Sequence, residues 1–240
     1  MFRLETASSQ SGRVPSNSNR PMANTRTNAN LPMPERRQPE NKVDEFTVNR
    51  GETSNGFRLA LNGALTYEGK TFTPRITVNK SIANFTISFL NKKWAGGIAN
   101  DQYGQHLSYF LDTTKMTATP MQKPGSWNAA VKILWSPSQR YMVALCAYEG
   151  DSFVRIDTKT KNVRDVGISY TEPASNYETM LRIIDEPRWS RNSDVLLFNV
   201  AKYCNPYEGS CGEGNRNVNR VLARFGVTLD VATLRISYAR

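Results

Sequence analysis

Residues 135–157, WSPSQRYMVALCAYEGDSFVRID, contain two candidate strands joined by a turn. Residues 136–140 form a turn, because the proline presets φ and the serines can hydrogen-bond to local backbone. The apolar run at 141–148 scarcely alternates with polar residues, and a strand that is apolar on both sides must be covered on both faces. Residues 153–157 alternate and form the return strand. This stretch therefore predicts a hairpin inside a stack of small sheets.

The second strand of this hairpin recurs along the chain. Residues 107–116 repeat the form of 153–163: an apolar strand, an aspartate (Asp112 or Asp157), a Thr/Lys turn and an apolar restart. A third return strand is expected at 221–230. A period of roughly 40 to 55 residues built from short strands is typical of β-propeller blades, whereas helical repeats show a 3.6-residue apolar period. The predicted class is therefore all-β.

The first strand recurs as well, since Trp135-Ser136 and Trp189-Ser190 each precede an apolar run, and the two tryptophans are expected at equivalent buried positions. Residues 135–145, WSPSQRYMVAL, resemble the W-S-P-D-G blade motif of TolB-like and related WD40-type β-propellers, and 187–198 is a degraded copy. The resemblance covers roughly residues 105–240. The usual Asp-Gly pair is replaced, and no copy has the Trp-Asp dipeptide. The resemblance implies propeller-like blade repeats or an open β-meander, an architecture that serves as a binding platform more often than as an enzyme.

The composition sets limits on the number of domains and on the partners. A chain of 240 residues with 39% hydrophobic content can build a core, which we place in one β-propeller-like domain at 43–240. The net charge of +10 favours acidic partners, although it also serves solubility alone. No apolar run approaches the roughly 20 residues that span a bilayer, and residues 1–13 lack the apolar stretch of a secretory signal. No transmembrane segment is predicted.

Residues 1–42 form a separate segment rich in Ser, Asn, Thr, Arg and Pro. Seven basic and three acidic side chains give it a charge of +4. With almost no apolar clusters it should not fold alone, so we expect a disordered N-terminal arm. Such an arm is either a plain tether or a contact that orders on an acidic partner, with Arg36 and Arg37 as candidate binding residues.

The N-terminal half of the domain is expected to form hairpins. Candidate strands lie at 57–61, 71–78 and 82–90, separated by turn residues. Residues 92–97 and 101–105 are expected to be loops, with Trp94 covering the edge of a core.

Residues 202–220, KYCNPYEGSCGEGNRNVNR, form a long insertion between two predicted strands. Long loops on rigid sheets often carry function. Tyrosine and arginine are enriched where proteins bind one another, so the candidate partner-binding residues here are Tyr203, Tyr207, Arg216 and Arg220.

The cysteines bear on the compartment, which the sequence leaves unknown. Cys204 and Cys211 are close enough for a local disulfide in an oxidising compartment, or are two free thiols in a reducing cytosol. A bond between them would favour a periplasmic or extracellular location. Cys146 lies in an apolar strand and should be buried.

No catalytic constellation stands out. His106 is the single histidine, and no nucleophile-elbow motif accompanies it. The carboxylates of Glu149, Asp151 and the Asp185-Glu186 pair lie in predicted turns, where acidic residues form local hydrogen bonds. The two loop cysteines lack the further ligands that a metal site needs. We therefore predict no catalytic residues, no metal and no cofactor.

These observations favour a non-enzymatic protein-binding or scaffold subunit that uses a β-blade platform, a basic N-terminal arm and a long Cys-containing loop. The expected partner is a protein with an acidic surface. Two alternatives stay open: a propeller-type glycan-active hydrolase, which needs two carboxylates facing across a cleft, and a basic nucleic-acid-binding protein.

Overall fold

The computed structural model describes residues 42–101, 107–122, 129–147, 151–168, 179–191, 193–204 and 221–239. All regular secondary structure in these ranges is β-strand, and every pair of named strands is antiparallel, so the predicted all-β class is confirmed. The predicted arm at 1–42 lies outside the described residues except for Lys42.

The strands are β1 (Val43–Asn49), β2 (Thr53–Ser54), β3 (Phe57–Leu59), β4 (Leu65–Tyr67), β5 (Lys70–Thr71), β6 (Ile82–Leu90), β7 (Trp94–Asp101), β8 (Leu107–Asp112), β9 (Thr117–Pro120), β10 (Ala129–Trp135), β11 (Tyr141–Ala147), β12 (Asp151–Asp157), β13 (Val163–Gly167), β14 (Thr179–Ile183), β15 (Arg188–Trp189), β16 (Val195–Cys204), β17 (Val221–Asp230) and β18 (Arg235–Ala239).

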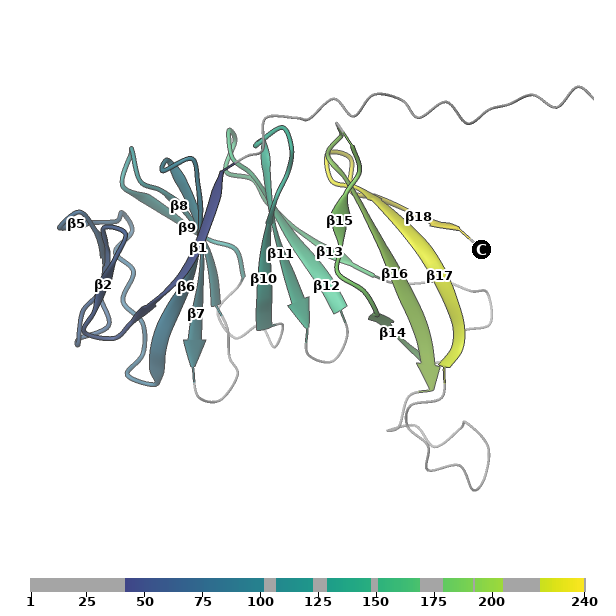
Figure 1. Cartoon of the computed structure of the whole chain (residues 1–240), viewed down its shortest axis with the longest axis horizontal. Helices are drawn as coiled ribbons and strands as arrows, with labels where there is room; N and C mark the ends of the chain where they lie inside the picture. The colour runs from purple at the N-terminus through teal and green to yellow at the C-terminus, as the bar shows by residue number, and fades with distance from the viewer. Residues whose placement is uncertain are drawn as a thin grey trace, which may run out of the picture. The chain divides into compact units, whose positions relative to one another are not determined.

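The strands form four sheets (Figure 1). A small sheet of β2-β3-β4-β5 is inserted in the chain between β1 and β6 of the first blade, whose order is β1-β6-β7-β8-β9. The second blade is β10-β11-β12-β13, and the third is β14-β16-β17-β18 with β15 also paired to β16. Most neighbouring strands of a blade are consecutive in the chain; the exceptions are β1 and β6, separated by the small sheet, and β14 and β16, separated by β15. This is the blade pattern expected from the repeats.

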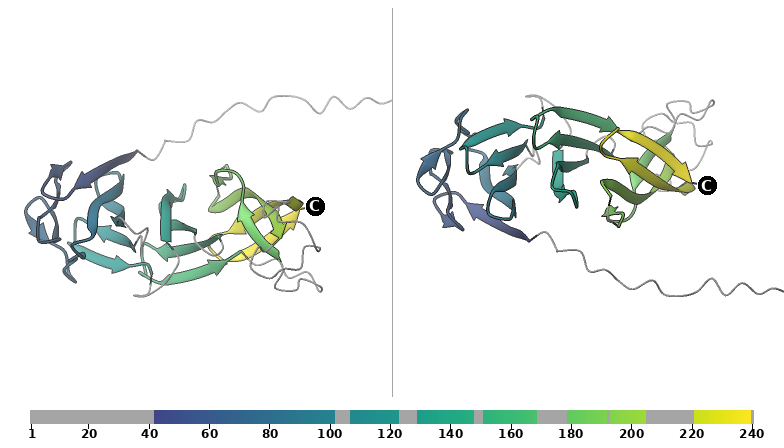
Figure 2. Two further views of the ribbon diagram at one scale, coloured as in Figure 1. Left: turned by 90° about the horizontal axis from the view of Figure 1, so that it is seen from below. Right: turned by 90° about the horizontal axis from the view of Figure 1, so that it is seen from above.

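Three apolar clusters join neighbouring sheets. In the first, the Phe57 ring of the small sheet packs edge-on to Phe89 of the first blade. In the second, Phe110 of the first blade packs on Trp135 of the second, and the third cluster lies between the second and third blades. Figure 2 shows the same succession of sheets from two further sides. The sheets are therefore stacked face to face, and this packing holds the blades together.

Strand β11 explains the apolar run that does not alternate. Met142, Ala144 and Cys146 belong to the cluster shared with the first blade, whereas Tyr141 and Val143 belong to the cluster shared with the third. The second blade is covered on both faces, as the sequence predicted.

The aspartate repeat is confirmed as a repeated turn between the last two strands of every blade. The aspartates are Asp112, Asp157 and Asp230. In each case Oδ1 accepts hydrogen bonds from the backbone N–H groups two and three residues later. The residue four positions later has a positive φ, namely 53° at Met116, 62° at Lys161 and 63° at Leu234. The three turns are therefore one structural element used three times.

The tryptophan repeat is confirmed in register but not in burial. Trp135 pairs with Met142 across β10 and β11, and Trp189 pairs with Leu196 across β15 and β16. The sequence separation between the tryptophan and its partner is the same in both pairs. Trp135 is 6% exposed, whereas Trp189 is half-buried. The prediction of equal burial was wrong, because Trp189 lies on a two-residue strand beside exposed Arg188.

Two predictions for the N-terminal half were also wrong. Residues 72–78 form no regular strand, although Phe72, Ile76 and Val78 are buried. Pro74 has no N–H to donate to a ladder, so the segment packs its apolar side chains without pairing fully. The expected hairpin at this point therefore has only the short strand β5.

The other error concerns the second part of 92–97, which was expected to be a loop: Lys92 and Lys93 do lie in a turn, but β7 begins at Trp94. Gly96 and Gly97 lie within β7, which pairs with β6 on one side and β8 on the other. A Cβ atom on Gly96 would lie 2.6 Å from Cγ2 of Ile133. Gly96 is therefore needed for close packing between the first and second blades, whereas a Cβ atom on Gly97 would have room at 3.4 Å from Phe85 of its own blade.

Candidate binding groove

A groove of about 570 Å³ lies between the second and third blades. Val131 and Lys132 of β10 form one wall, and residues 183–187 form the other. Leu145 and Ala147 of β11 also line it. The groove is thus built where the edge strand of one blade faces the connection between β14 and β15 of the next.

Two apolar side chains are exposed in this groove. Val131 is 53% exposed because a register shift between Ala130 and Lys132 leaves it without a cross-strand partner on β11. A bulge of this kind redirects a side chain away from the regular face of its sheet. Ile184, on the opposite wall, is 37% exposed. These residues form an apolar surface that is open to a partner.

Each of the three carboxylates in the groove contacts the protein. Asp151 accepts a hydrogen bond from the N–H of Ile183 and pairs with Arg182 at 3.5 Å. Asp185 accepts hydrogen bonds from the backbone N–H of Asn199, at 2.7 Å, and from its Nδ2, at 2.6 Å. These contacts fix the 183–187 wall to both blades.

The third carboxylate, on Glu186, forms an ion pair with Lys132 across the groove. Their side chains are 70% and 39% exposed. An ion pair exposed to this degree adds little to folding stability. The pair therefore spans the groove without closing it firmly.

The arrangement suits binding better than acid–base catalysis. A glycosidase needs one carboxyl group that protonates the leaving group and a second carboxylate across a cleft. Here the carboxylates of Asp151 and Asp185 hold backbone groups of the walls in place. The contacts favour a structural role for both, with the exposed apolar side chains left as the recognition surface.

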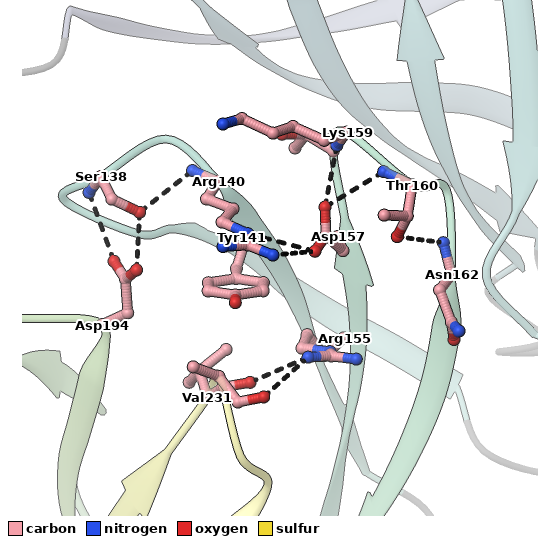
Figure 3. A network of polar contacts seen from close by, with 12 residues as sticks. Ser138, Arg140, Tyr141, Arg155, Asp157, Lys159, Thr160, Asn162, Asp194 and Val231 are labelled. Carbon is pink, nitrogen blue, oxygen red and sulfur yellow. Dashed lines mark hydrogen bonds and ion pairs between the residues drawn. The ribbon is translucent and has the colours of Figure 1, made fainter.

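A polar network joins the second and third blades at the other ends of the strands (Figure 3). Ser138 donates from Oγ to Asp194 at 2.6 Å, and Arg155 donates from Nη1 to the carbonyl groups of Val231 and Ala232 at 3.2 Å each. The Arg155 guanidinium also lies 5.2 Å from the centre of the Tyr141 ring. These contacts, together with the third apolar cluster, set the spacing of the two blades that form the groove.

The Asp112 turn adds an ion pair between the first and second blades. Lys161 lies 3.6 Å from Oδ2 of Asp112 and 4.0 Å from the centre of the Phe110 ring. Burial acts to raise the pKa of Asp112, but hydrogen bonds from Thr114 and Lys115 and the charge of Lys161 outweigh it and lower the pKa below its ordinary value of 3.8.

We expect Asp112→Asn to lower the free energy of unfolding by about 1 to 2 kcal/mol at pH 7, because hydrogen bonds to the charged group are weakened. A lowered folded-state pKa stabilises the protein above the unfolded value of 3.8, and this contribution is lost as pH falls through the folded-state pKa. Urea unfolding of both proteins should therefore show a difference that shrinks below about pH 4. Asp165→Asn, at an exposed position on β13, is the control. If the difference in unfolding free energy between the native protein and Asp112→Asn does not change with pH, the charged Asp112 carboxylate is not the source of the stabilisation.

Of the sequence-predicted binding residues, the structure describes Tyr203, which is not among the residues that line this groove. Tyr203 is half-buried near the end of β16, where it pairs with Val221 at the base of the insertion, and Cys204 ends the same strand. The other predicted residues lie outside the described residues: Arg36, Arg37, Tyr207, Cys211, Arg216, Arg220 and His106. Their assignments stay predictions.

The groove itself was only partly foreseeable. The sequence predicts turn carboxylates at Asp151 and at the Asp185-Glu186 pair, and all three line the groove; Asp151 differs from the prediction in being the first residue of β12. No sequence signal marks Val131 or Ile184, because an apolar residue on a strand is expected to be buried.

The described ranges contain no candidate metal cluster, and they contain the buried thiol of Cys146. Within them, no three His, Cys, Asp or Glu residues are placed to hold a metal ion, and no helix could cross a membrane. Cys146 is buried, and burial raises the pKa of its thiol to about 11 despite a hydrogen bond from Gln122. At neutral pH its thiolate is scarce, which argues against Cys146 as a nucleophile.

Comparisons with known proteins find similarity in structure but not in sequence. No protein-family model matches the chain, and no curated protein matches it significantly in sequence. Among solved structures, TolB from Acinetobacter baumannii is similar, with a TM-score of 0.29 and 10% sequence identity over 66% of this chain. The chain spans about half of the TolB structure, 49% of its length. The propeller-like description of the blades rests on the strand pairing within this chain.

Proposed function

We propose that this chain is a non-enzymatic binding or scaffold subunit whose β-blade platform holds a partner protein. The supporting observation is the groove, in which Val131 and Ile184 are exposed while the carboxylates of Asp151 and Asp185 are bound to wall groups. Exposed apolar side chains in a concave site are typical of recognition surfaces. The stacked blades supply a rigid frame for such a surface.

The proposal includes two contact elements outside the described residues. The arm at 1–42, with a charge of +4, would attract an acidic surface of the partner through Arg36 and Arg37. The loop at 202–220 would add Tyr207, Arg216 and Arg220 beside Tyr203, residue types enriched at binding hot spots. A local disulfide between Cys204 and Cys211 would shape this loop.

Capture from the native source, followed by mass spectrometry, tests the binding function. The full chain is compared with the charge variant Arg36→Gln/Arg37→Gln and with a variant whose 202–220 loop is shortened. We expect the Arg36/Arg37 variant to keep its melting temperature and to capture less partner, with the greater loss at low salt because surface charges are least screened there. Unchanged capture by both variants would contradict the two contact elements.

The enzyme alternative has its own test, because the groove does contain carboxylates. A glycan substrate screen should show no hydrolysis by the full chain. Hydrolysis that disappears in Asp151→Asn or Glu186→Gln would favour the glycan-active hydrolase instead, since either substitution removes a carboxylate that could act as acid or nucleophile.

The disulfide is tested by alkylating protein from its native compartment with and without prior reduction. We expect Cys204 and Cys211 to react only after reduction if the compartment is oxidising. Cys146 is an internal reference, since its buried, high-pKa thiol should resist alkylation until the chain unfolds. Three thiols that react at once in the folded protein would contradict both assignments.

A further inference from the structure

The groove differs in charge from the rest of the protein. The whole chain carries +10, yet the groove is lined by three carboxylates, those of Asp151, Asp185 and Glu186. Against them stand two cations, Lys132 in the lining and Arg182 paired with Asp151, so the local balance stays negative. A concave site concentrates the field of the charges that line it. The groove therefore favours a cationic segment, whereas the chain as a whole favours acidic surfaces.

The ion pair across the groove can be exchanged for a ligand. The Glu186 side chain is 70% exposed and the Lys132 side chain 39% exposed, so separating them costs little. An incoming Lys or Arg can replace Lys132 at the Glu186 carboxylate. Lys132 is then a competitor for the cationic ligand, and its removal should strengthen binding.

The walls of the groove suit an extended segment. Among the described strands, β10 pairs with β11 alone, and β14 and β15 pair with β16 alone, so both walls belong to sheet edges. Peptides that lie along a sheet edge are bound in an extended form, with alternate side chains pointing into the site. Val131 on one wall and Ile184 on the other would contact those side chains.

We propose that the groove between the second and third blades binds an extended segment of a partner protein with alternating apolar side chains and a flanking Lys or Arg. This inference rests on the proposed binding function and adds a second binding site to it. The groove prefers a cationic ligand, whereas the basic arm prefers an acidic one. The apolar side chains pack between Val131 and Ile184, and the cationic side chain takes the place of Lys132 at Glu186.

The test measures binding of the full chain to arrayed seven-residue peptides. One array combines Val, Ile, Leu and Phe at alternate positions with Lys or Arg at either end, and a matched array carries Asp or Glu instead. We expect binding to the cationic array, at least about tenfold tighter than to the acidic one, with an affinity that falls as salt is added. If the chain binds neither array, or binds both with equal affinity, the proposal is wrong.

Variants then locate the site. Val131→Asp and Ile184→Asp should each weaken the cationic peptides about tenfold or more, whereas Leu61→Asp, at a residue that is 78% exposed and lies in the small sheet's turn, should not. Lys132→Gln should strengthen peptide binding several-fold, and Glu186→Gln should weaken it. If both substitutions change the affinity in the same direction, the ligand does not replace Lys132 at Glu186.

Two further measurements separate this inference from other outcomes. If the groove is instead closed by a second copy, sedimentation will show a dimer that dissociates in Val131→Asp, and the peptides will not compete; that result would refute the proposal. Arg36→Gln/Arg37→Gln should leave peptide binding unchanged while it lowers partner capture. If the full chain captures a partner but binds no peptide, the groove proposal fails and the binding function stands. If it binds the cationic peptides but captures no partner, the proposed function fails and the groove site stands.

Discussion

Replacing Trp135 by alanine should lower the free energy of unfolding by about 3 to 5 kcal/mol, the range for removing a buried aromatic side chain. The indole lies between the first and second blades, is 6% exposed, and packs edge-on to Phe110 with ring centres 6.3 Å apart. Its Nε1 donates to Oγ of Ser88 at 3.1 Å. Alanine would leave both a cavity and an unpaired buried hydroxyl group.

The measurement is urea unfolding followed by circular dichroism, with two companion variants. Trp189→Ala should cost clearly less, since Trp189 has the equivalent register but is only half-buried. Trp135→Phe should lose about 1 kcal/mol, because it keeps most of the packing and gives up the hydrogen bond to Ser88. A loss for Trp135→Ala below half the expected range, or equal to that for Trp189→Ala, would contradict this account of the first interface.

The repeats were predictable from the sequence because each depends on a local device. The three turn aspartates need only a carboxylate followed by free N–H groups, so Asp112, Asp157 and Asp230 can be found by inspection. The apolar run of β11 was equally informative, since only a strand covered on both faces avoids alternation.

The errors arose where long-range packing overrides local preference. Glycine is a poor strand former, yet Gly96 lies in β7 because the side chain of Ile133 in the second blade leaves no room for a Cβ atom. Residue 131 is exposed because of a bulge, and nothing in the sequence VKILW distinguishes it from a buried valine. The groove depends on the placement of two blades, which a single sequence does not encode in any one motif.

The third blade shows a regular alternation that the second lacks. Along β16, Leu196, Phe198 and Val200 are buried in the cluster shared with the second blade, while Asn199 between them is exposed. A sheet with one buried and one polar face alternates in this way. The buried face of the third blade is therefore the one that packs on the second.

Arg155→Ala should accordingly loosen the third blade, with an expected loss of about 3 kcal/mol. Arg155 is 9% exposed, donates from Nη1 to the carbonyl groups of Val231 and Ala232 at 3.2 Å each, and lies over the Tyr141 ring. Hydrogen bonds to a charged group are worth about 1.5 to 3 kcal/mol, and a desolvated cation–π contact up to about 2. Alanine removes both and leaves two carbonyl groups of the third blade without their donor.

Hydrogen exchange distinguishes this local effect from general destabilisation. Amides of β16 and β17 should exchange faster in Arg155→Ala, while those of β6 and β7 in the first blade should change much less, because separate regions of a protein can open independently. Arg164→Ala is the matched control, since Arg164 pairs with Arg155 across β12 and β13 but is exposed. If exchange accelerates equally in the first and third blades, or if Arg164→Ala has the same effect, then Arg155 does not couple the two blades that form the groove.

If the third blade alone loosens, the affinity of the groove for its peptides should fall as well. Both walls must keep their spacing for Val131 and Ile184 to contact one ligand.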